Sequence, residues 1–548
     1  MDHSLLKLWQ ARKEDSVSME NLSNILELSQ KQTKRKLIKW AGEGWLEYVP
    51  GKGRGHKSQI HWKRNVEEEY VNKAFILIEQ NELAQVSKFI RYHWSEEAKQ
   101  RLMAALHTAF GFRSLDKDTL IIPHHYSVLN THPLKASDVL SASIASNVFS
   151  RLATLKEDGS FMPDLAHNWD ITSTSLTFYI RKDVRFHDGT ILRAEDIVES
   201  LLAMKQDAHF EDLWKPIQHV YTPAPLIVKL DFPDGCPYAL QLVCSVAAGI
   251  YKESKGKWIG TGSFYLVEHT EQKTALTAFT SHFGHRPLLD AVEYIKVPKD
   301  FSILYQGSNE QEPADITEIE SDSGFGLVIM NPYRHSATSQ KEVRDYIHGI
   351  IAEHREEIPD IHKRARINHE GCLMGRSIKK TPPTRRNKLI IDEPILIAYT
   401  HYFSTLTYWL RDILQRNGLS VTLKRIPFEQ MANDPDPLHG ADLFIHGEVL
   451  EPNHSFSFFY FLKNRYSPLY PLVCREPVLA DYTNRYSTIP FTDWMHLHLD
   501  IEQYLHDQSL CIPLYYEKRQ IPFSMNIRDV QTNYFGYADL TKLWIKPY

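Results

Sequence analysis

The chain has 548 residues, of which 43% are hydrophobic and 24% charged, and its formal net charge at pH 7 is −5. This length exceeds what one hydrophobic core usually supports, so several domains are expected. No apolar run approaches the ~20 residues that a helix needs to span a bilayer, so the sequence predicts no transmembrane helix. Five scattered cysteines, never in CxxC spacing, predict neither a disulfide framework nor a zinc ribbon. The first residues do not resemble an export signal, which predicts a cytoplasmic location.

Charge is unevenly distributed along the chain. Residues 1–64 carry 13 Lys and Arg against seven Asp and Glu, a net of +6, which leaves −11 for the remainder. Because DNA repels an acidic protein, a basic segment on an acidic body is where nucleic-acid contact would be localised. A basic face without a nucleic-acid partner is the alternative on charge alone.

The basic segment has the pattern of a winged helix-turn-helix. Apolar spacing predicts a helix over 4–13, a second helix after Ser18 as N-cap, and a third helix over 30–41 after a break at Ser29. In the third helix, Leu37, Ile38 and Trp40 are expected to face inward. Its other face carries amide and cationic side chains that could reach base edges and phosphates: Gln30, Lys31, Gln32, Lys34, Arg35 and Lys36.

A Gly-rich basic hairpin follows the third helix. Predicted strands over 45–49 and 59–62 flank the sequence PGKGRGHKS, a composition typical of a wing that touches the DNA backbone or minor groove. The spacing of Gly and Lys does not fit an NTP-binding phosphate loop. The order of helix, turn, basic helix and basic hairpin predicts binding of double-stranded DNA by residues 1–64, with a protein-docking winged helix as the alternative. The candidate DNA contacts in the wing are Lys52, Arg54, His56 and Lys57.

Residues 65–115 are predicted to form a helical connector. An acidic first turn at 67–69 opens one helix or two, and a further helix over 96–110 has Ser95 as its expected N-cap. The segment is too apolar for a flexible linker. It either couples the head to the body or forms the interface of a homodimer, and the sequence does not choose between these.

From residue 116 onward, short strands alternate with amphipathic helices, beginning with a strand over 119–122 and a helix over 142–152. Five segments carry specific motifs: NVFSRLATLKEDGSFMPDLAHNWDI (147–171), SLTFYIRKDVRFHDGTILRAEDIVESL (175–201), IGTGSFYL (259–266), KEVRDYI (341–347) and CIPLYYEKR (511–519). In this order they resemble the motifs of family 5 extracellular solute-binding proteins. Together with GWLEYVPGKGRG (44–55), they make the whole chain similar to the SgrR family of bacterial regulators.

The resemblance implies a multidomain α/β protein with a two-lobed, periplasmic-binding-protein-like body of type II, similar to peptide binders. Lobe one would comprise about 116–285 plus 511–548, and lobe two about 286–510, with a ligand cleft between them. It implies a transcriptional regulator that senses a sugar, a sugar phosphate or a short peptide and controls transport or sugar-phosphate stress genes. The alternative is an intracellular solute- or peptide-binding protein whose winged helix docks a protein partner.

The ligand contacts that this resemblance implies are few. Exported peptide binders have Gly-Trp-x-x-Asp-Tyr in the region of 443–452, where the acid pairs with the peptide's ammonium group. Here Glu448 occupies the aromatic position and Glu451 stands near the acid, which favours a neutral or cationic solute. A sugar phosphate would need cations at the cleft, and the candidates within reach of the expected cleft are Arg334 and Lys379-Lys380. Further candidates are Asn331 after a strand over 326–330, Trp258, His125 and Tyr126.

The sequence does not predict an enzyme. It contains no HExxH and no GxSxG motif. His124-His125 has no third metal ligand placed by spacing, and His496 and His498 would diverge on one helix. No catalytic residue, metal or cofactor is therefore expected.

Overall fold

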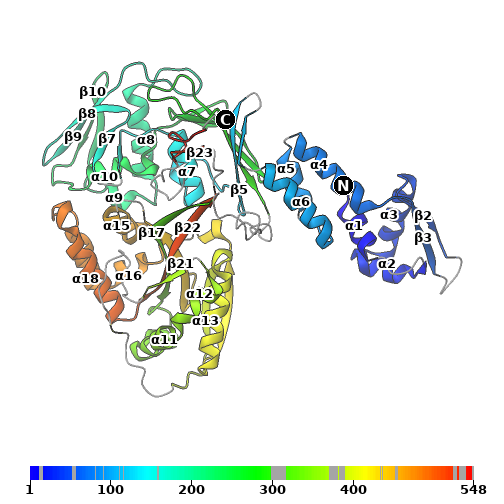
Figure 1. The fold of residues 1–548 in the computed structure, drawn as a ribbon. Coiled ribbons are helices and arrows are strands. Elements are labelled where there is room, and N and C mark those ends of the chain that lie inside the picture. The colour runs from blue at the N-terminus through cyan, green and yellow to red at the C-terminus, as the bar shows by residue number, and fades with distance from the viewer. Residues whose placement is uncertain are drawn as a thin grey trace.

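The computed structural model describes residues 1–11, 16–51, 57–80, 82–90, 92–109, 111–114, 117–156, 159–297, 316–363, 365–368, 381, 389–431, 434, 436–450, 454–522, 527–529 and 539–545. They form a small N-terminal head, a helical connector and a large body, and the connector lies between the other two (Figure 1). Within these ranges, no helix combines the length and the apolar character that a membrane crossing requires.

The head has the helices and the hairpin of a winged helix, as predicted. The side-chain oxygens of Ser18 and Ser29 accept hydrogen bonds from the first turns of the second and third helices, so both serines are N-caps. The strands form an antiparallel sheet in the order β1-β3-β2. The described elements are α1 (His3–Gln10), β1 (Ser16–Val17), α2 (Met19–Leu26), α3 (Gln30–Gly42), β2 (Leu46–Val49) and β3 (Ser58–Trp62).

The connector consists of α4 (Val66–Glu79), α5 (Leu83–Ile90) and α6 (Glu96–Ala109). Ser95 caps α6, since its hydroxyl accepts from the backbone N–H of Ala98 at 3.2 Å, as predicted. The Arg101 guanidinium donates to both carboxylate oxygens of Glu68, at 2.7 and 2.9 Å, and so joins α6 to α4. The connector is thus a packed helical unit.

The described part of lobe one contains two larger sheets, besides two-stranded pairs. The first has the order β14-β15-β16-β5-β4, in which β5 and β16 are parallel neighbours. Helix α7 (Val139–Val148) supplies Ile144 and Val148 to its core. The second sheet is antiparallel in the order β10-β11-β9-β8. The strands are β4 (Gly111–Ser114), β5 (Asp118–His124), β8 (Ala166–Ile171), β9 (Ser175–Ile180), β10 (His219–Ala224), β11 (Ile227–Asp231), β14 (Phe264–His269), β15 (Lys273–Ala278) and β16 (Ala291–Lys296).

Two glycines of lobe one form a close-packed bend in IGTGSF. A Cβ atom on Gly260 would lie 2.2 Å from the carbonyl oxygen of Val148, and one on Gly262 would lie 2.3 Å from that of Asn147. Real Cβ atoms do not approach oxygen so closely, so both positions require glycine. This motif is therefore architectural: it holds the segment before β14 against the end of α7.

Lobe two is built on a mixed sheet in the order β18-β22-β17-β21-β19-β20. Helices α11 (Lys341–His354) and α13 (Ser404–Arg416) cover one face, and α15 (His454–Lys463) and α18 (Trp494–Asp507) cover the other. Adjacent residues of β21 alternate accordingly, with Phe444 in one core and Ile445 in the other. The strands are β17 (Ile316–Met330), β18 (Ala365–Ile367), β19 (Ile395–Thr400), β20 (Val421–Ile426), β21 (Leu443–Val449) and β22 (Cys511–Pro522).

The chain passes between the lobes at later residues than predicted. Strand β16 pairs with β5, so lobe one extends through Lys296 and not only to about residue 285. Strand β22, expected in lobe one, pairs along its length with β17 in the sheet of lobe two. Leu540 and Leu543 then pack in the core of lobe one. Strand pairing across hundreds of residues decides these boundaries, and local patterns carry no information about it.

A continuous apolar core joins the two lobes on one side. The Tyr238 ring, just before α10 (Ala239–Cys244), lies 5.2 Å from the Phe459 ring of α15 and 5.6 Å from the Trp494 ring of α18. All three side chains are buried. Helix α15 and the first residue of α18 therefore pack against the α10 region of lobe one, and Figure 1 shows α15 where the two lobes meet.

Candidate nucleic-acid interface and ligand cleft

Helix α3 presents a polar, cationic face to solvent. Thr33, Leu37 and Trp40 are fully buried in the core of the head. Of the predicted DNA contacts on this helix, those that are exposed and have no ion-pair partner among the described residues are Gln30, Lys31, Lys34 and Arg35. Uncompensated cations on an exposed helix are suited to phosphate contact.

Two other predicted contacts are used inside the head. The Gln32 side chain accepts hydrogen bonds from the backbone N–H and the hydroxyl of Ser29, at 3.2 and 2.8 Å, and completes a capping box. The Lys36 ammonium group lies 3.3 Å from a carboxylate oxygen of Asp2 and donates to the Ser4 hydroxyl at 2.7 Å. Both side chains therefore stabilise the helix and its attachment to α1, which weakens the case for base contact by either.

The prediction that Ile38 faces inward is wrong. Its side chain is 56% exposed, although its neighbour Leu37 is fully buried. The residue lies four positions after Lys34 and three after Arg35, which places it on the exposed cationic face of the helix. Apolar character alone suggested the core, whereas the helical spacing from Thr33, Leu37 and Trp40 would have excluded it.

The wing is described only at its base. Strands β2 and β3 pair from Leu46 opposite Trp62 to Val49 opposite Gln59. Lys57, next to β3, is exposed. The predicted contacts Lys52, Arg54 and His56 lie outside the described residues.

The connector packs against both neighbours. On the side of the head, the Tyr70 hydroxyl of α4 accepts from the backbone N–H of Asp2 at 2.8 Å. On the side of the body, Val86 and Ile90 of α5 share a core with Ile121 of β5 and Ile295 of β16. This contact answers the question that the sequence left open about coupling: the head is fixed through the connector to the parallel strand pair of lobe one. A homodimer stays a prediction.

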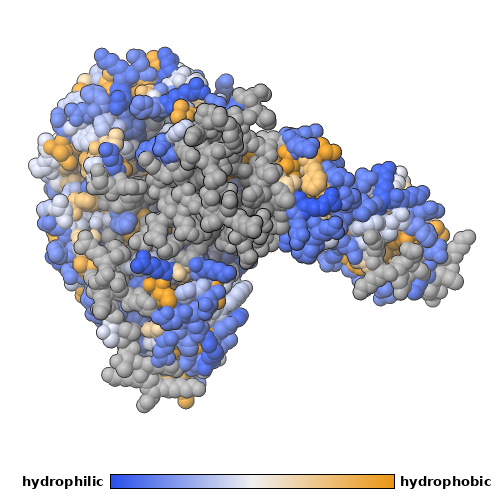
Figure 2. Space-filling view, in the orientation of Figure 1, coloured by the Kyte–Doolittle hydropathy of each residue, from blue (hydrophilic) through white to orange (hydrophobic). Residues whose placement is uncertain are grey.

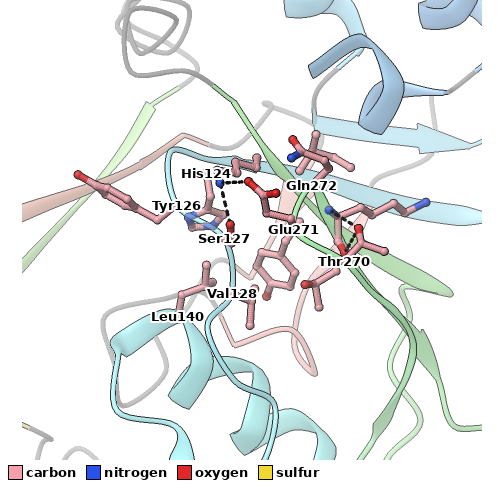
Figure 3. Close-up of a pocket in the computed structure, with 13 residues that line it drawn as sticks. His124, Tyr126, Ser127, Val128, Leu140, Thr270, Glu271 and Gln272 are labelled. Carbon is pink, nitrogen blue, oxygen red and sulfur yellow. Dashed lines mark hydrogen bonds and ion pairs between the residues drawn. The ribbon is translucent and has the colours of Figure 1, made fainter. Parts of the chain in front are cut away.

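Beyond the ends of these two strands lies a contact between the lobes. The Tyr126 ring, which follows β5, is 4.5 Å from the Tyr402 ring and 5.4 Å from the His401 ring, both after β19 of lobe two. The preceding His125 ring is 6.5 Å from that of Tyr126. Figure 3 shows Tyr126 extending away from Glu271 and the other labelled side chains of lobe one. Tyr402 and His401 were not predicted, although an aromatic run directly after a buried strand is a usable signal.

A recess in lobe one borders this contact (Figure 3). The Lys296 ammonium group at the end of β16 donates to the Ser127 hydroxyl at 2.9 Å and to a Glu271 carboxylate oxygen at 3.0 Å. The recess holds about 190 Å³ including its opening to solvent, below the roughly 300–1,000 Å³ typical of ligand sites. It therefore accommodates solvent and an ion-pair network better than a solute.

Trp258 lies at the rim of lobe one. It is 41% exposed and belongs to β13 (Lys257–Ile259). Its ring is 4.6 Å from that of His132 and 5.5 Å from that of Tyr251, so one face of the indole is packed. Its exposed remainder could contact a ligand or a partner.

Asn331, a predicted ligand contact, is buried and holds a turn. Its side-chain amide donates to the Ala441 carbonyl at 3.0 Å and its oxygen accepts from the Tyr333 backbone N–H at 3.0 Å. Nearby, the buried carboxylate of Asp442 accepts from the Arg334 guanidinium and from the backbone N–H of Leu396 at 2.8 Å. Arg334 is thus neutralised within lobe two, which opposes a role as a phosphate-binding cation; Lys379 and Lys380 lie outside the described residues.

Glu448 remains a candidate at the end of β21. Its side chain is 35% exposed, and its carboxylate lies 3.2 Å from Nε2 of His446. The preceding Gly447 passes directly over the Phe403 ring, where a Cβ atom would come within 2.5 Å. Because Phe403 directly follows Tyr402, this places β21 next to the aromatic contact between the lobes. Glu451 lies outside the described residues.

Comparisons with known proteins agree with this architecture. Residues 3–112 match the family described as "Sugar transport-related sRNA regulator N-term", and residues 160–322 match "Bacterial extracellular solute-binding proteins, family 5 Middle". The chain is 21% identical to the HTH-type transcriptional regulator SgrR of Photorhabdus laumondii and 23% identical to that of Pectobacterium atrosepticum. Each alignment covers 100% of this chain and 99% of the relative.

Solved structures share the fold of the body. The periplasmic binding protein DppA of Helicobacter pylori, in complex with the peptide STSA, has a TM-score of 0.68 at 15% identity and covers 80% of this chain and 99% of its own. NikA of Brucella suis, in complex with Fe(III)-EDTA, has a TM-score of 0.63 at 15% identity, and the match covers 78% of this chain and 100% of NikA. The molecule is thus a winged helix joined to a family 5 solute-binding fold. Over its whole length the chain is similar to the HTH-type transcriptional regulators named SgrR.

Proposed function

We propose that this protein is a DNA-binding transcriptional regulator whose affinity for its operator depends on a small solute bound by the body. The observation that carries the proposal is the exposed face of α3. Lys31, Lys34 and Arg35 are held on a helix whose other side is buried, in a head that is packed against its connector. The relatives named as HTH-type transcriptional regulators support it.

The connector supplies the route by which a ligand would influence the head. Strands β5 and β16 touch the connector through Ile121 and Ile295. Tyr126, just after β5, lies at the contact between the lobes, and Lys296, the last residue of β16, bonds to the neighbouring Ser127. A solute that changes the contact of Tyr126 with lobe two would shift the ends of β5 and β16. The surface of these strands on which α5 packs would shift with them. Such coupling requires that the solute bind the two arrangements with different affinity.

The proposed solute is small and neutral or cationic. Glu448 contributes a carboxylate beside the aromatic contact, whereas Arg334 is already paired with Asp442. Proteins with this fold hold ligands as different as a peptide and Fe(III)-EDTA, so the fold does not fix the ligand. Sugars and short peptides therefore come before sugar phosphates as expected ligands. The proposed contacts are Tyr126, His125, Trp258, Glu448 and Glu451.

We further propose that the protein acts in the cytoplasm, where its DNA is, and that it has no catalytic activity. The relatives are named as regulators and the structural neighbours as binding proteins. A function in transport or sugar stress rests on the name of the matched N-terminal family.

The experiment that tests the proposal uses the full chain in two measurements. A thermal-shift screen of sugars, sugar phosphates and short peptides identifies the solute, because a ligand that binds only the folded state raises the melting temperature. Fluorescence anisotropy with duplexes from the region upstream of its own gene then measures DNA affinity with and without that solute. We expect binding that weakens steeply with salt and changes with the solute. A head that binds no duplex, while the chain retains a solute and a protein partner, would establish the docking alternative.

A further inference from the structure

Ile38 is an exposed apolar side chain at the C-terminal end of a cationic stripe on α3. It is 56% exposed on α3, and the exposed side chains one and two turns before it are Lys34 and Lys31. Arg35 lies three positions before it on the same stripe. The core of the head is complete without this residue, because Leu37 and Trp40 on the inner face are fully buried.

Local stability does not account for isoleucine at this position. A β-branched residue forms helix less readily than alanine, lysine or arginine, and an exposed side chain gains little from burial. A single exposed hydrophobic residue is common on protein surfaces. What distinguishes Ile38 is its surroundings, since the exposed cations Lys31, Lys34 and Arg35 precede it on the same face of α3.

The partner that fits this arrangement is the major groove of DNA. Its rims are phosphates, which complement Lys31, Lys34 and Arg35, and its floor carries one apolar group, the C5 methyl of thymine. We propose that Ile38 contacts the C5 methyl group of a thymine and thereby selects an A·T pair at one position of the operator. This rests on the proposed function, and it names a base contact beyond the residues predicted from the sequence.

The test is a selection of duplexes from a random library by the full chain and by the Ile38→Ala variant. We expect the parent to select a thymine at a position where the variant shows no preference. Replacing that thymine by deoxyuridine removes only the methyl group. Binding by the parent should weaken about fourfold, because this corresponds to the free energy gained by burying one methyl group. The variant should bind the two duplexes equally. Ile38→Val, which keeps an apolar branched side chain, should retain most of the discrimination.

A matched control is Ile76→Ala, which removes an isoleucine that is 51% exposed on α4, away from the DNA-facing helix. It should leave both affinity and preference unchanged. If Ile38→Ala selects the same sites as the parent and responds equally to deoxyuridine, the thymine contact is wrong while DNA binding stands. If Ile38→Ala weakens DNA binding equally on all duplexes, the proposal is also overturned, because Ile38 would then contact DNA without distinguishing thymine from other bases. Absence of duplex binding by the parent would overturn the proposed function itself.

Discussion

The head and the body use charged and polar side chains in opposite ways. On α3 the cations Lys31, Lys34 and Arg35 are exposed and have no described ion-pair partner. In the body, Asn331 and Arg334 are engaged by neighbours within lobe two. The difference teaches that a surface suited to a large polyanion carries unpaired cations, whereas Asn331 and Arg334 spend their polar groups on the scaffold of lobe two. Salt should therefore weaken DNA binding by the head, whereas acid should lower the folding stability of the body.

The largest expected effect is acid destabilisation of the body. His348 and His498 are fully buried, and burial lowers the pKa of each to about 3. Below the unfolded value near 6.5, the unfolded chain binds protons that the folded chain does not, so stability falls as pH decreases. Each histidine should cost roughly 2 kcal/mol between pH 7 and pH 5. Urea unfolding of the full chain at both pH values measures this.

The head provides the internal control for that experiment, because its described histidines, His3 and His61, are exposed. Its transition should move little over the same range. A body as stable at pH 5 as at pH 7, or His348→Asn and His498→Asn variants with the parent's pH profile, would show that the buried histidines do not govern acid stability.

The next effect concerns DNA affinity. The double variant Lys34→Ala, Arg35→Ala should lose two phosphate contacts, which at 0.1 M salt corresponds to roughly 50-fold weaker binding. The slope of log affinity against log salt should fall by about 2, one unit for each contact. Anisotropy titrations from 50 to 200 mM salt test both numbers. Lys182→Ala with Lys257→Ala, two exposed cations of the body, is the matched control. An unchanged slope would remove these residues from the interface.

A smaller effect is expected at the lobe contact. Tyr126→Ala removes a ring that lies 4.5 Å from that of Tyr402, and an aromatic pair of this kind contributes about 0.5–1.5 kcal/mol beyond its buried area. A double-mutant cycle with Tyr402→Ala measures the coupling in urea unfolding. Solute binding should weaken in the same variants. As a control, Tyr221→Ala, on an exposed strand of lobe one, should show no coupling to Tyr402 and should leave solute binding unchanged. Additive losses at Tyr126 and Tyr402 would mean that the rings do not stabilise one another.

The smallest effect concerns the attachment of α1. Asp2 caps α1, and its carboxylate also accepts from Lys36 and from the Trp40 indole N–H at 3.1 Å. Burial opposes ionisation, but Lys36 and these hydrogen bonds outweigh it and lower the pKa. The stabilisation is therefore present above the unfolded value and lost as pH falls through the lower folded value. Asp2→Ala should cost about 1 kcal/mol, measured by melting of the head at pH 7. Glu20→Ala, exposed on α2, should cost less; equal losses would argue against the network.

The sequence predicted what depends on local spacing. The N-caps Ser18 and Ser95 are as predicted, because capping is decided within a few residues. Ile38 is not inward-facing, because its helical spacing from the buried residues Thr33, Leu37 and Trp40 places it on the opposite face despite its apolar side chain.

What could not be predicted depends on contacts between distant segments. The membership of β22 in lobe two follows from its pairing with β17, nearly 200 residues earlier in the chain. The role of Asn331 follows from the carbonyl of Ala441, which no local pattern places beside it. The Tyr126 contact with Tyr402 likewise exists only once both lobes have folded.

The apolar seat of α5 has a practical consequence for dissecting the molecule. Ile121 and Ile295 are each only 1% exposed because the connector covers them, together with Val86 and Ile90 from the other side. A truncated sensor beginning near residue 116 would expose both isoleucines on a sheet face, and a head ending before α6 would expose the opposite surface. Both fragments should aggregate. Separately expressed sensors of this chain therefore need residues 65–115 to remain soluble. The head needs α4 as well, because Val66 and Tyr70 are buried in its core.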